Sequence, residues 1–305
     1  SGIASHRAAY PVFGIECQTE PALSVTHPDG NMSLDLEISD VTTSKLKNAT
    51  LTTVTMKDKV YPFIVKINYK AYDNSDVIET WSEITNNEKK PVLLRKFASA
   101  TLPIRRGEVW LSHLHGTWAD EGRLVQEELN PGMMVIKNKD GVRNSMTDHG
   151  EVMFSLDGKP QENSGRVIGA ALCWSGNYKL SIDTDNNREH QFIAGINEEN
   201  SEYKLMPKET FVTPELALTY SNKGLSGVSR NFHKWARLDG KLYNGEKLRD
   251  ILLNSWEGVY FDINEKGMDD MMSDISSMGG ELFVMDDGWF GDKYPRKDDK
   301  SSLGD

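Results

Sequence analysis

Residues 281–305 read ELFVMDDGWFGDKYPRKDDKSSLGD and decide how the fold of this chain is interpreted. The segment opens with four apolar residues, 282–285, which predict a short parallel strand that is covered on both faces. Asp286 and Asp287 follow directly, and an indole follows at Trp289. Ligands of α/β proteins bind at the carboxyl ends of the strands. The segment therefore predicts a ligand site.

Two carboxylates beside a flat aromatic ring are suited to a sugar. Carboxylate oxygens accept hydrogen bonds from hydroxyl groups, and an indole covers the apolar face of a pyranose ring. The same carboxylates could ligate a divalent cation, but the adjacent Trp289 favours the sugar. An acidic loop that binds nothing is the plain structural alternative.

The residues before this segment predict the rest of a βαβ unit. Residues 248–253 lead into NSWEGVYF at 254–261. Residues 264–278 then predict an amphipathic helix that ends at two glycines. Its apolar face is formed by Met268, Met271, Met272, Ile275 and Met278. A strand, a helix and a second strand with short links are the first step of a parallel sheet or barrel.

Residues 1–240 show the two-residue period of β-strands instead. Leu34, Leu36 and Ile38 alternate with polar residues, and the same alternation returns at residues 63–70. Further strands are predicted at 77–84, 91–102, 123–128, 133–137, 152–156, 165–173, 177–183 and 190–196. About twelve or more short strands at this spacing are typical of a large antiparallel sandwich.

A change of period marks the predicted domain boundary. Residues 221–238 have apolar side chains at helical spacing, and Gly240 provides a stop for this helix. We therefore expect residues 1–240 to form a sandwich domain. Residues 241–305 are expected to begin a second domain built on a parallel sheet or barrel.

Three motifs carry a resemblance to a known family. MDDGWFG at 285–291, followed by Asp298-Asp299 and SSLGD at 301–305, resembles the second barrel strand of glycoside hydrolase family 36. NSWE at 254–257 is similar to the first barrel strand of that family. Residues 111–121 and 143–149 resemble sandwich segments more loosely, and SMTDH at 145–149 departs from the Ser-Ser-His run that is frequent there.

The resemblance implies a fold and a function. The family combines an N-terminal β-supersandwich with a (β/α)₈ barrel, and it comprises α-galactosidases with some α-N-acetylgalactosaminidases and galactosyl-transferring relatives. It implies a retaining enzyme that acts on terminal α-linked galactose without a cofactor or metal. By resemblance, Asp286 and Asp287 bind the O4 and O6 hydroxyls of the galactose, and Trp256 forms a wall of the same subsite. The nucleophile and the acid/base are aspartates of later barrel strands, which places them beyond residue 305.

The residues themselves argue against Asp286 and Asp287 as the catalytic pair. Retaining hydrolysis requires two carboxyl groups about 5–5.5 Å apart on opposite sides of the scissile bond. Neighbouring residues of an extended strand point to opposite faces, so these two aspartates cannot flank one bond. A (β/α)₈ barrel takes about 250 residues. We therefore expect the sequence to be the N-terminal portion of the enzyme, inactive by itself.

Composition excludes several classes of partner. The formal net charge of −11 and the absence of a basic stripe argue against nucleic acid and anionic membranes. No apolar run is long enough for a membrane helix. The expected partner is a galactose-containing oligosaccharide or glycoconjugate, and the family suggests a homo-oligomer. The compartment stays open, as does a disulfide between Cys17 and Cys173, for which two buried thiols are the alternative.

Alternatives of function also stay open. A non-catalytic carbohydrate-binding or assembly module would use the sandwich alone. Within the enzyme interpretation, hydrolysis and sugar transfer are not separated, nor are galactose and N-acetylgalactosamine. His113 and His115 would share one face of a strand, as metal ligands or as ordinary histidines. Trp110 and Trp118 would pack in the core or an interface, or would stack on a sugar.

Overall fold

The structure is a computed structural model that describes residues 8–14, 19–104, 106–239, 242, 245 and 247–289. It divides into two compact units, residues 1–243 and 244–305, which are treated separately below. Cys17, the predicted stop at Gly240 and the motif residues 290–305 lie outside the described residues. The expectations that concern them stay predictions.

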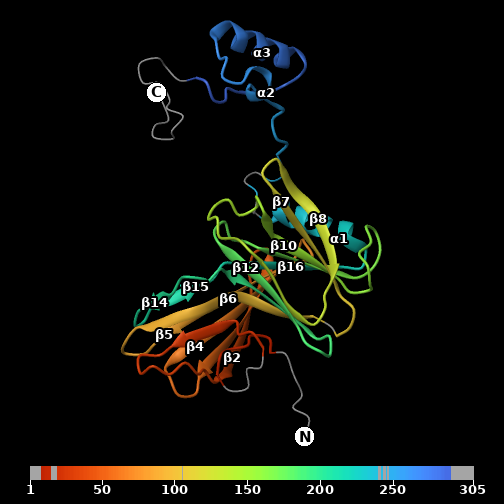
Figure 1. Cartoon of the computed structure of the whole chain (residues 1–305). Helices are drawn as coiled ribbons and strands as arrows, with labels where there is room; N and C mark the ends of the chain where they lie inside the picture. The colour runs from red at the N-terminus through yellow and green to blue at the C-terminus, as the bar shows by residue number, and fades with distance from the viewer. Residues whose placement is uncertain are drawn as a thin grey trace. The chain divides into compact units, whose positions relative to one another are not determined.

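The described part of the larger unit is an antiparallel sandwich of two sheets (Figure 1). The ten-stranded sheet runs in the order β2 (Leu36–Lys45), β3 (Ala49–Asp58), β4 (Phe63–Tyr72), β5 (Val77–Asn86), β16 (Leu216–Ser221), β11 (Val167–Leu172), β10 (Asp148–Ser155), β7 (Trp110–Thr117) and β8 (Asp120–Glu128), with β15 (Thr210–Val212) paired to β5. The six-stranded sheet runs in the order β1 (Leu23–Thr26), β6 (Val92–Ile104), β13 (His190–Ile196), β12 (Tyr178–Thr184) and β9 (Gly132–Lys137), with β14 (Tyr203–Leu205) paired to β6. The predicted β-rich architecture is confirmed.

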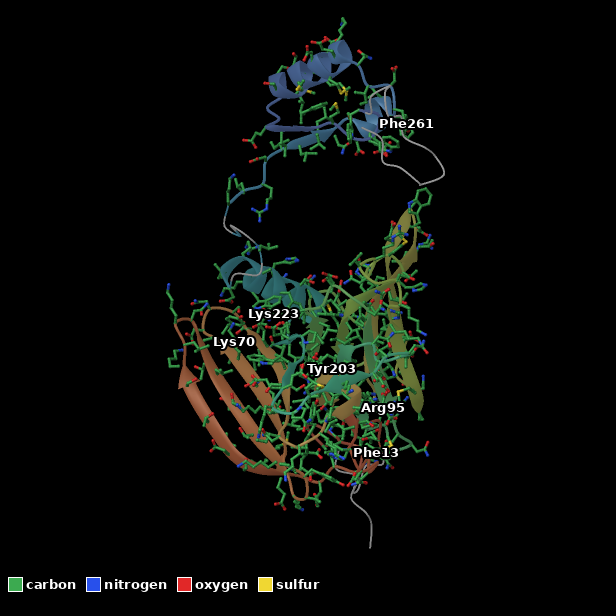
Figure 2. All side chains as sticks on the ribbon, turned by 90° about the vertical axis from the view of Figure 1, so that its left-hand side faces the viewer. Phe13, Lys70, Arg95, Tyr203, Lys223 and Phe261 are labelled. Atoms are coloured by element: carbon green, nitrogen blue, oxygen red, sulfur yellow. The ribbon has the colours of Figure 1, made fainter. Side chains whose placement is uncertain are left out.

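Apolar side chains from both sheets form the core between them. Phe154 on β10 and Phe192 on β13 meet edge to face, with ring centroids 5.1 Å apart. A second buried cluster contains Phe63 on β4 and Leu94 on β6. The two sheets can be followed in Figure 2 from Lys70, on β4, and Arg95, on β6.

The strand prediction was incomplete, and it placed one residue on the wrong face. β3 and β16 were not predicted; β3 is threonine-rich, and nearly all its side chains are half-buried, so its sequence shows no contrast between two faces. Ile38 was expected on the buried face of its strand but is 67% exposed. It lies on β2, an edge strand, and an irregularity between Ile38 and Asp40 shifts the register with β3. Of the three alternating apolar residues Leu34, Leu36 and Ile38, only Leu34, which precedes the strand, is buried.

The predicted helix is present as α1 (Gly224–Leu238), and it packs on the larger sheet. Gly169 on β11 allows this close approach, because a Cβ at this position would lie 2.4 Å from Val228 Cγ1. Trp235 and Val228 are the large buried side chains of the helix. No described helix is long and apolar enough to span a membrane.

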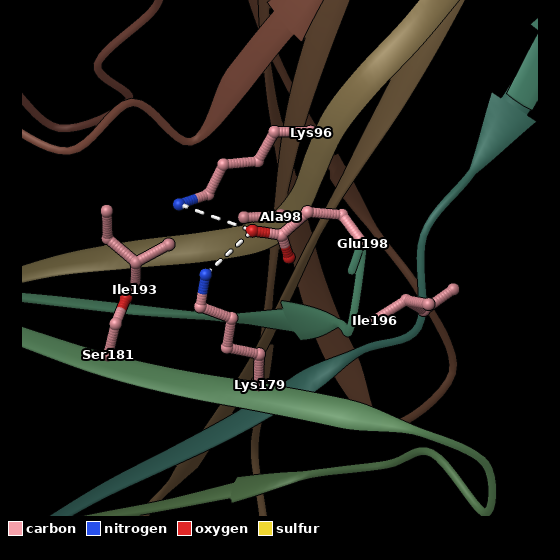
Figure 3. Close-up of a pocket in the computed structure, with 7 residues that line it drawn as sticks. All are labelled: Lys96, Ala98, Lys179, Ser181, Ile193, Ile196 and Glu198. Atoms are coloured by element: carbon pink, nitrogen blue, oxygen red, sulfur yellow. Dashed lines mark hydrogen bonds and ion pairs between the residues drawn. The ribbon is translucent and has the colours of Figure 1, made fainter. Parts of the chain in front are cut away.

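Four charged side chains form an ion cluster beside the six-stranded sheet, and Figure 3 shows three of them, Lys96, Lys179 and Glu198. Lys179 Nζ lies 2.8 Å from Glu198 and 3.5 Å from Glu20. Lys96 contacts Glu20 and lies 4.0 Å from Glu198. The Ser181 hydroxyl donates a hydrogen bond of 2.6 Å to Glu20. The opposite charges balance, as buried ionised groups require.

The smaller unit contains a βαβ arrangement. β17 (Leu252–Asn254) and β18 (Leu282–Val284) are parallel, and α2 (Trp256–Val259) and α3 (Glu265–Ser277) lie between them in sequence. Helix α3 begins where Asn264 Oδ1 accepts a hydrogen bond of 2.9 Å from the Gly267 backbone N–H. The predicted helix is confirmed.

The expected burial of the second strand is wrong in the described residues. Leu282 is 43% exposed and Met285 is 48% exposed. The described part of this unit supplies one partner strand and two helices, which are too few elements to cover both faces of β18. Met268 on α3 is buried, whereas Met278, the residue that follows the helix, is 75% exposed, so the predicted apolar face is only partly covered.

Candidate functional site

The two parallel strands bring distant residues to one edge. Asn254, the last residue of β17, lies opposite Val284, the last residue of β18. The Ser255 backbone N–H donates a hydrogen bond of 2.9 Å to the Val284 carbonyl. The residues that follow both strands, including Trp256 and Asp286, therefore leave the sheet from the same carboxyl edge.

The carboxylate of Asp286 is held by its neighbours. Asn254 Nδ2 donates a hydrogen bond of 2.8 Å to Asp286 Oδ2, and the Asp287 backbone N–H donates one of 2.7 Å to Oδ1. The Asp286 backbone N–H donates to Ser255 Oγ at 3.0 Å. The Ser255 residue is fully buried. These contacts fix the orientation of the Asp286 side chain.

The same contacts favour the ionised form of Asp286. The backbone N–H of Asp287 and then the side-chain amide of Asn254 lower the pKa of Asp286 below the ordinary value of an aspartate. Asp286 is therefore an anion at neutral pH. Each of its oxygens has a further lone pair, so it can still accept a hydrogen bond from a hydroxyl group.

The loop after β18 needs glycine at position 288. Gly288 has φ +108°, a conformation that side chains other than glycine's rarely adopt. A Cβ at this position would also lie 2.8 Å from Phe261 Cα and from the Phe261 carbonyl oxygen. The loops that follow the two strands thus pack against each other directly.

Trp256 is anchored beside this edge. Its backbone N–H donates a hydrogen bond of 2.8 Å to Asn254 Oδ1. Its ring meets Tyr260 and Phe261 edge to face, with centroids 5.3 and 4.8 Å apart. The backbone of Tyr260 has a positive φ of +50°, which turns the chain sharply after α2.

The three predicted site residues, Asp286, Asp287 and Trp256, are thus brought to one edge of the sheet. Their part in sugar binding stays a prediction. Asn254 and Ser255 were not assigned a role, although both hold Asp286 in place. The available signal was a pair of polar residues at the end of the preceding strand.

Chemically, the edge offers acidic hydrogen-bond acceptors next to aromatic rings. The described residues contain no group of three or more His, Cys, Asp or Glu side chains that could hold a metal ion. Trp289, which was expected to favour a sugar, is 51% exposed.

The two histidines considered as metal ligands contact different carboxylates. His113 Nε2 lies 3.3 Å from Glu127 Oε1, and His113 is 8% exposed. His115 Nδ1 lies 2.8 Å from Asp148 Oδ1. Each histidine thus has its own acidic neighbour on an adjacent strand or loop.

The aromatic residues of the sandwich have separate environments. Trp110 Nε1 donates a hydrogen bond of 2.8 Å to Glu108. Trp118 lies in the turn between β7 and β8 and is 77% exposed, so core packing is wrong for this residue. No described residue covers its ring to the degree that burial would require. Cys173, expected to be buried, is half-buried and packs near α1.

Comparison with known proteins identifies the family. Residues 1–206 match the glycosyl hydrolase family 36 N-terminal domain, and residues 210–305 match the melibiase family. The chain belongs to glycosyl hydrolase family 36. The predicted fold class, a sandwich followed by the start of a barrel, agrees with that of the family.

Two family 36 relatives illustrate the similarity. Alpha-galactosidase Mel36A of Lactobacillus acidophilus is 32% identical over 302 residues, which cover 93% of this chain and 40% of the relative. The crystal structure of alpha-galactosidase AgaA of Geobacillus stearothermophilus superposes with a TM-score of 0.88 at 27% identity, covering 97% of this chain and 43% of AgaA. The chain spans about two fifths of the length of these relatives.

Proposed function

We propose that this chain is the N-terminal part of a retaining α-galactosidase that acts on terminal α-linked galactose. Residues 1–240 would be its sandwich domain, and residues 241–305 the start of its catalytic barrel. Support comes from the relatives, which are named alpha-galactosidases and of which this chain covers 40–43%. The observation that carries the proposal is the Asp286 carboxylate, held at the strand edge beside Asp287 and Trp256.

The proposed role of this edge is to bind the terminal galactose. The ionised Asp286 and its neighbour Asp287 accept hydrogen bonds from sugar hydroxyls, and hydrogen bonds to a charged acceptor are the stronger kind. Trp256 contributes an aromatic wall. Variants of AgaA have been crystallised in complex with stachyose and with raffinose, and we propose galactose-containing oligosaccharides of this kind as substrates here.

The bond-breaking groups are proposed to lie outside residues 1–305. Asp286 and Asp287 are adjacent, and the Asp287 N–H is bound to the Asp286 carboxylate. This geometry fixes one carboxylate against the next residue's backbone. It does not set two carboxyl groups on opposite sides of a glycosidic bond, as retention requires at a separation of about 5–5.5 Å.

Hydrolysis of p-nitrophenyl α-galactoside tests the proposal. We expect activity in the protein isolated from its native host and none in the 305-residue form. In the active protein, Asp287→Ala should lower kcat/KM at least 100-fold, which corresponds to about 3 kcal/mol. Asp269→Ala on the exposed side of α3 is the matched control and should change it little.

Two outcomes would contradict parts of the proposal. A loss of less than about threefold for Asp287→Ala would remove this residue from the sugar subsite. Activity of the isolated 305-residue form would show that the catalytic groups are within it. p-Nitrophenyl α-N-acetylgalactosaminide, measured in parallel, distinguishes the two sugar specificities. Absence of hydrolysis in both forms would favour the non-catalytic carbohydrate-binding module.

A further inference from the structure

The sandwich contains a second concave site, which shares no residue with the strand edge described above. A pocket of about 330 Å³ opens between β10, the end of β11 and the start of β12. This volume lies within the range of small-molecule sites, which begins at about 300 Å³. Asn144, Ser145 and His149 form part of its wall, and the proposed activity leaves the SMTDH sequence at 145–149 unexplained.

The walls of the pocket are held by hydrogen bonds between loops. Asn144 Nδ2 donates one of 3.0 Å to the Trp174 carbonyl. Trp174 Nε1 donates one of 3.1 Å to the Asn177 carbonyl, so the indole nitrogen already has a hydrogen-bond partner. Trp174 as a whole is 41% exposed. A Cβ at Gly176 would lie 2.8 Å from Trp174 Nε1, which shows how closely the turn fits the indole. The ring is thus oriented before any ligand binds.

Two other lining residues carry polar atoms without a hydrogen-bond partner among the described residues. They are the hydroxyl of Tyr178, a residue that is 1% exposed, and Nε2 of His149. Burial raises the pKa of Tyr178, and the nearby Asp148 and Glu151 raise it further, so the phenol keeps its proton. Buried polar groups are nearly always hydrogen-bonded, to protein, water or ligand. Both atoms are enclosed by the surrounding protein and belong to the wall of the pocket.

The chemistry of the lining selects a class of occupant. Glu151 lines the pocket and holds His149 Nδ1 at 3.0 Å, so a carboxylate beside the site disfavours anions. Asn144, Ser145 and Glu151 provide donors and acceptors for hydroxyl groups. An exposed indole beside such groups suits a pyranose ring. We propose that this pocket binds one pyranose unit of a neutral carbohydrate, with Trp174 against its apolar face.

Gly150 keeps the pocket open and offers a graded test. A Cβ built on Gly150 would lie 3.8 Å from the Leu172 carbonyl oxygen and from the Tyr178 ring, which is ordinary contact. Alanine therefore fits at this position without displacing a neighbour. A leucine side chain would extend further into the space that a ligand needs. Gly150→Ala and Gly150→Leu thus differ in the occupied volume of the pocket.

Calorimetric titration of this chain with methyl α-D-galactopyranoside and methyl α-D-glucopyranoside tests the proposal. At least one of the two is expected to bind with a Kd of about 1–10 mM, because a single sugar unit has only about a dozen non-hydrogen atoms. Gly150→Leu should abolish this binding, and Gly150→Ala should leave it within about threefold. Trp174→Ala should weaken it about tenfold or more.

Two controls separate this pocket from the proposed galactose subsite. Asp287→Ala should leave the measured Kd unchanged, because Asp287 belongs to the other unit. Tyr220→Phe, at a 51% exposed tyrosine of β16, should also leave it unchanged. Circular dichroism confirms that each variant is folded; should Trp174→Ala unfold, the two Gly150 variants still decide. The proposal is overturned if neither sugar binds, or if binding survives Gly150→Leu and is lost with Asp287→Ala.

Discussion

Asn254 donates a hydrogen bond of 2.8 Å from its side-chain amide to the carboxylate of Asp286, 32 residues further along the chain. The bond joins the ends of the two parallel strands. It also holds one oxygen of the carboxylate that we propose for galactose binding. Whether the site is well formed therefore depends on a residue outside the acidic motif.

We expect Asn254→Ala to raise the pKa of Asp286, because the ionised carboxylate loses a donor. Titration of the Asp286 carboxyl carbon by NMR measures this. Stability that comes from the ionised carboxylate is present above the pKa of the unfolded chain, and it is lost as pH falls through the lower pKa of the folded chain. In the variant, the pKa of Asp286 in the folded chain should therefore lie closer to its pKa in the unfolded chain. Asn264→Ala, which removes only the cap of α3, should leave the Asp286 titration unchanged.

Ser255→Ala should loosen the backbone at Asp286. The serine hydroxyl accepts the Asp286 N–H, and no oxygen replaces it in alanine. The loss of one buried hydrogen bond costs about 1 kcal/mol. Amide hydrogen exchange at Asp286 should accelerate, whereas Ser277→Ala on the exposed end of α3 should not affect it. Equal exchange rates in Ser255→Ala and the parent chain would show that this bond does not hold the loop.

Gly288→Ala should destabilise the smaller unit more than Gly279→Ala does. Both glycines have positive φ, +108° and +91°, so both substitutions carry a backbone cost of about 1–2 kcal/mol. Only at Gly288 would the new Cβ also meet backbone, at 2.8 Å from Phe261; nothing lies within 4 Å at Gly279. Denaturant unfolding, followed by exchange of the β17 and β18 amides, compares the variants. Equal losses would mean that the two loops separate without cost.

Lys96→Met should destabilise the sandwich, because Glu20 would lose its closest cation in a place where the Lys96 side chain is only 11% exposed. Removing one partner of a buried ion pair costs about 3–5 kcal/mol, and the remaining Lys179 reduces the expected loss to about 2–4 kcal/mol. Lys59→Met, which breaks exposed ion pairs with Asp35 and Glu37, is the control and should cost much less. Urea unfolding measures both. In Lys96→Met/Glu20→Gln part of the loss should be recovered, since no carboxylate is then left unpaired.

The same ion cluster makes the stability of the sandwich depend on pH. Burial by itself would raise the pKa of Glu20, but hydrogen bonds from Lys96 and Ser181 outweigh it and hold the pKa below its ordinary value. The contribution of Glu20 is therefore complete above the pKa of an unfolded glutamate, and it is lost as pH falls through the folded value. As the pH is lowered, the urea concentration at the midpoint of unfolding should decrease less steeply in Glu20→Gln than in the parent chain. Parallel curves would show that Glu20 does not contribute.

Local pattern explains most of what could be predicted. Residues 63–70 alternate except at Ile64 and lie in β4, and residues 264–278 have helical spacing and form α3 within one residue at each end. Such periods reflect which side of an element is buried. Ile38 has the same alternating surroundings but lies at a sheet edge, so the pattern predicted burial wrongly there. The side chains of β3 are nearly all half-buried, so the pattern did not predict this strand.

The sequence by itself determined the family, the β-rich architecture and the acidic motif at the end of a short strand, because motif residues and periods are properties of neighbouring positions. Only the tertiary structure decided that Asn254 and Ser255 hold Asp286, and that Trp174 and Tyr178 share a pocket with Gly150. These relationships depend on strand register and on loop packing between segments far apart in the chain. A hydrogen bond needs its two atoms within about 3 Å, and local spacing carries no information on that distance.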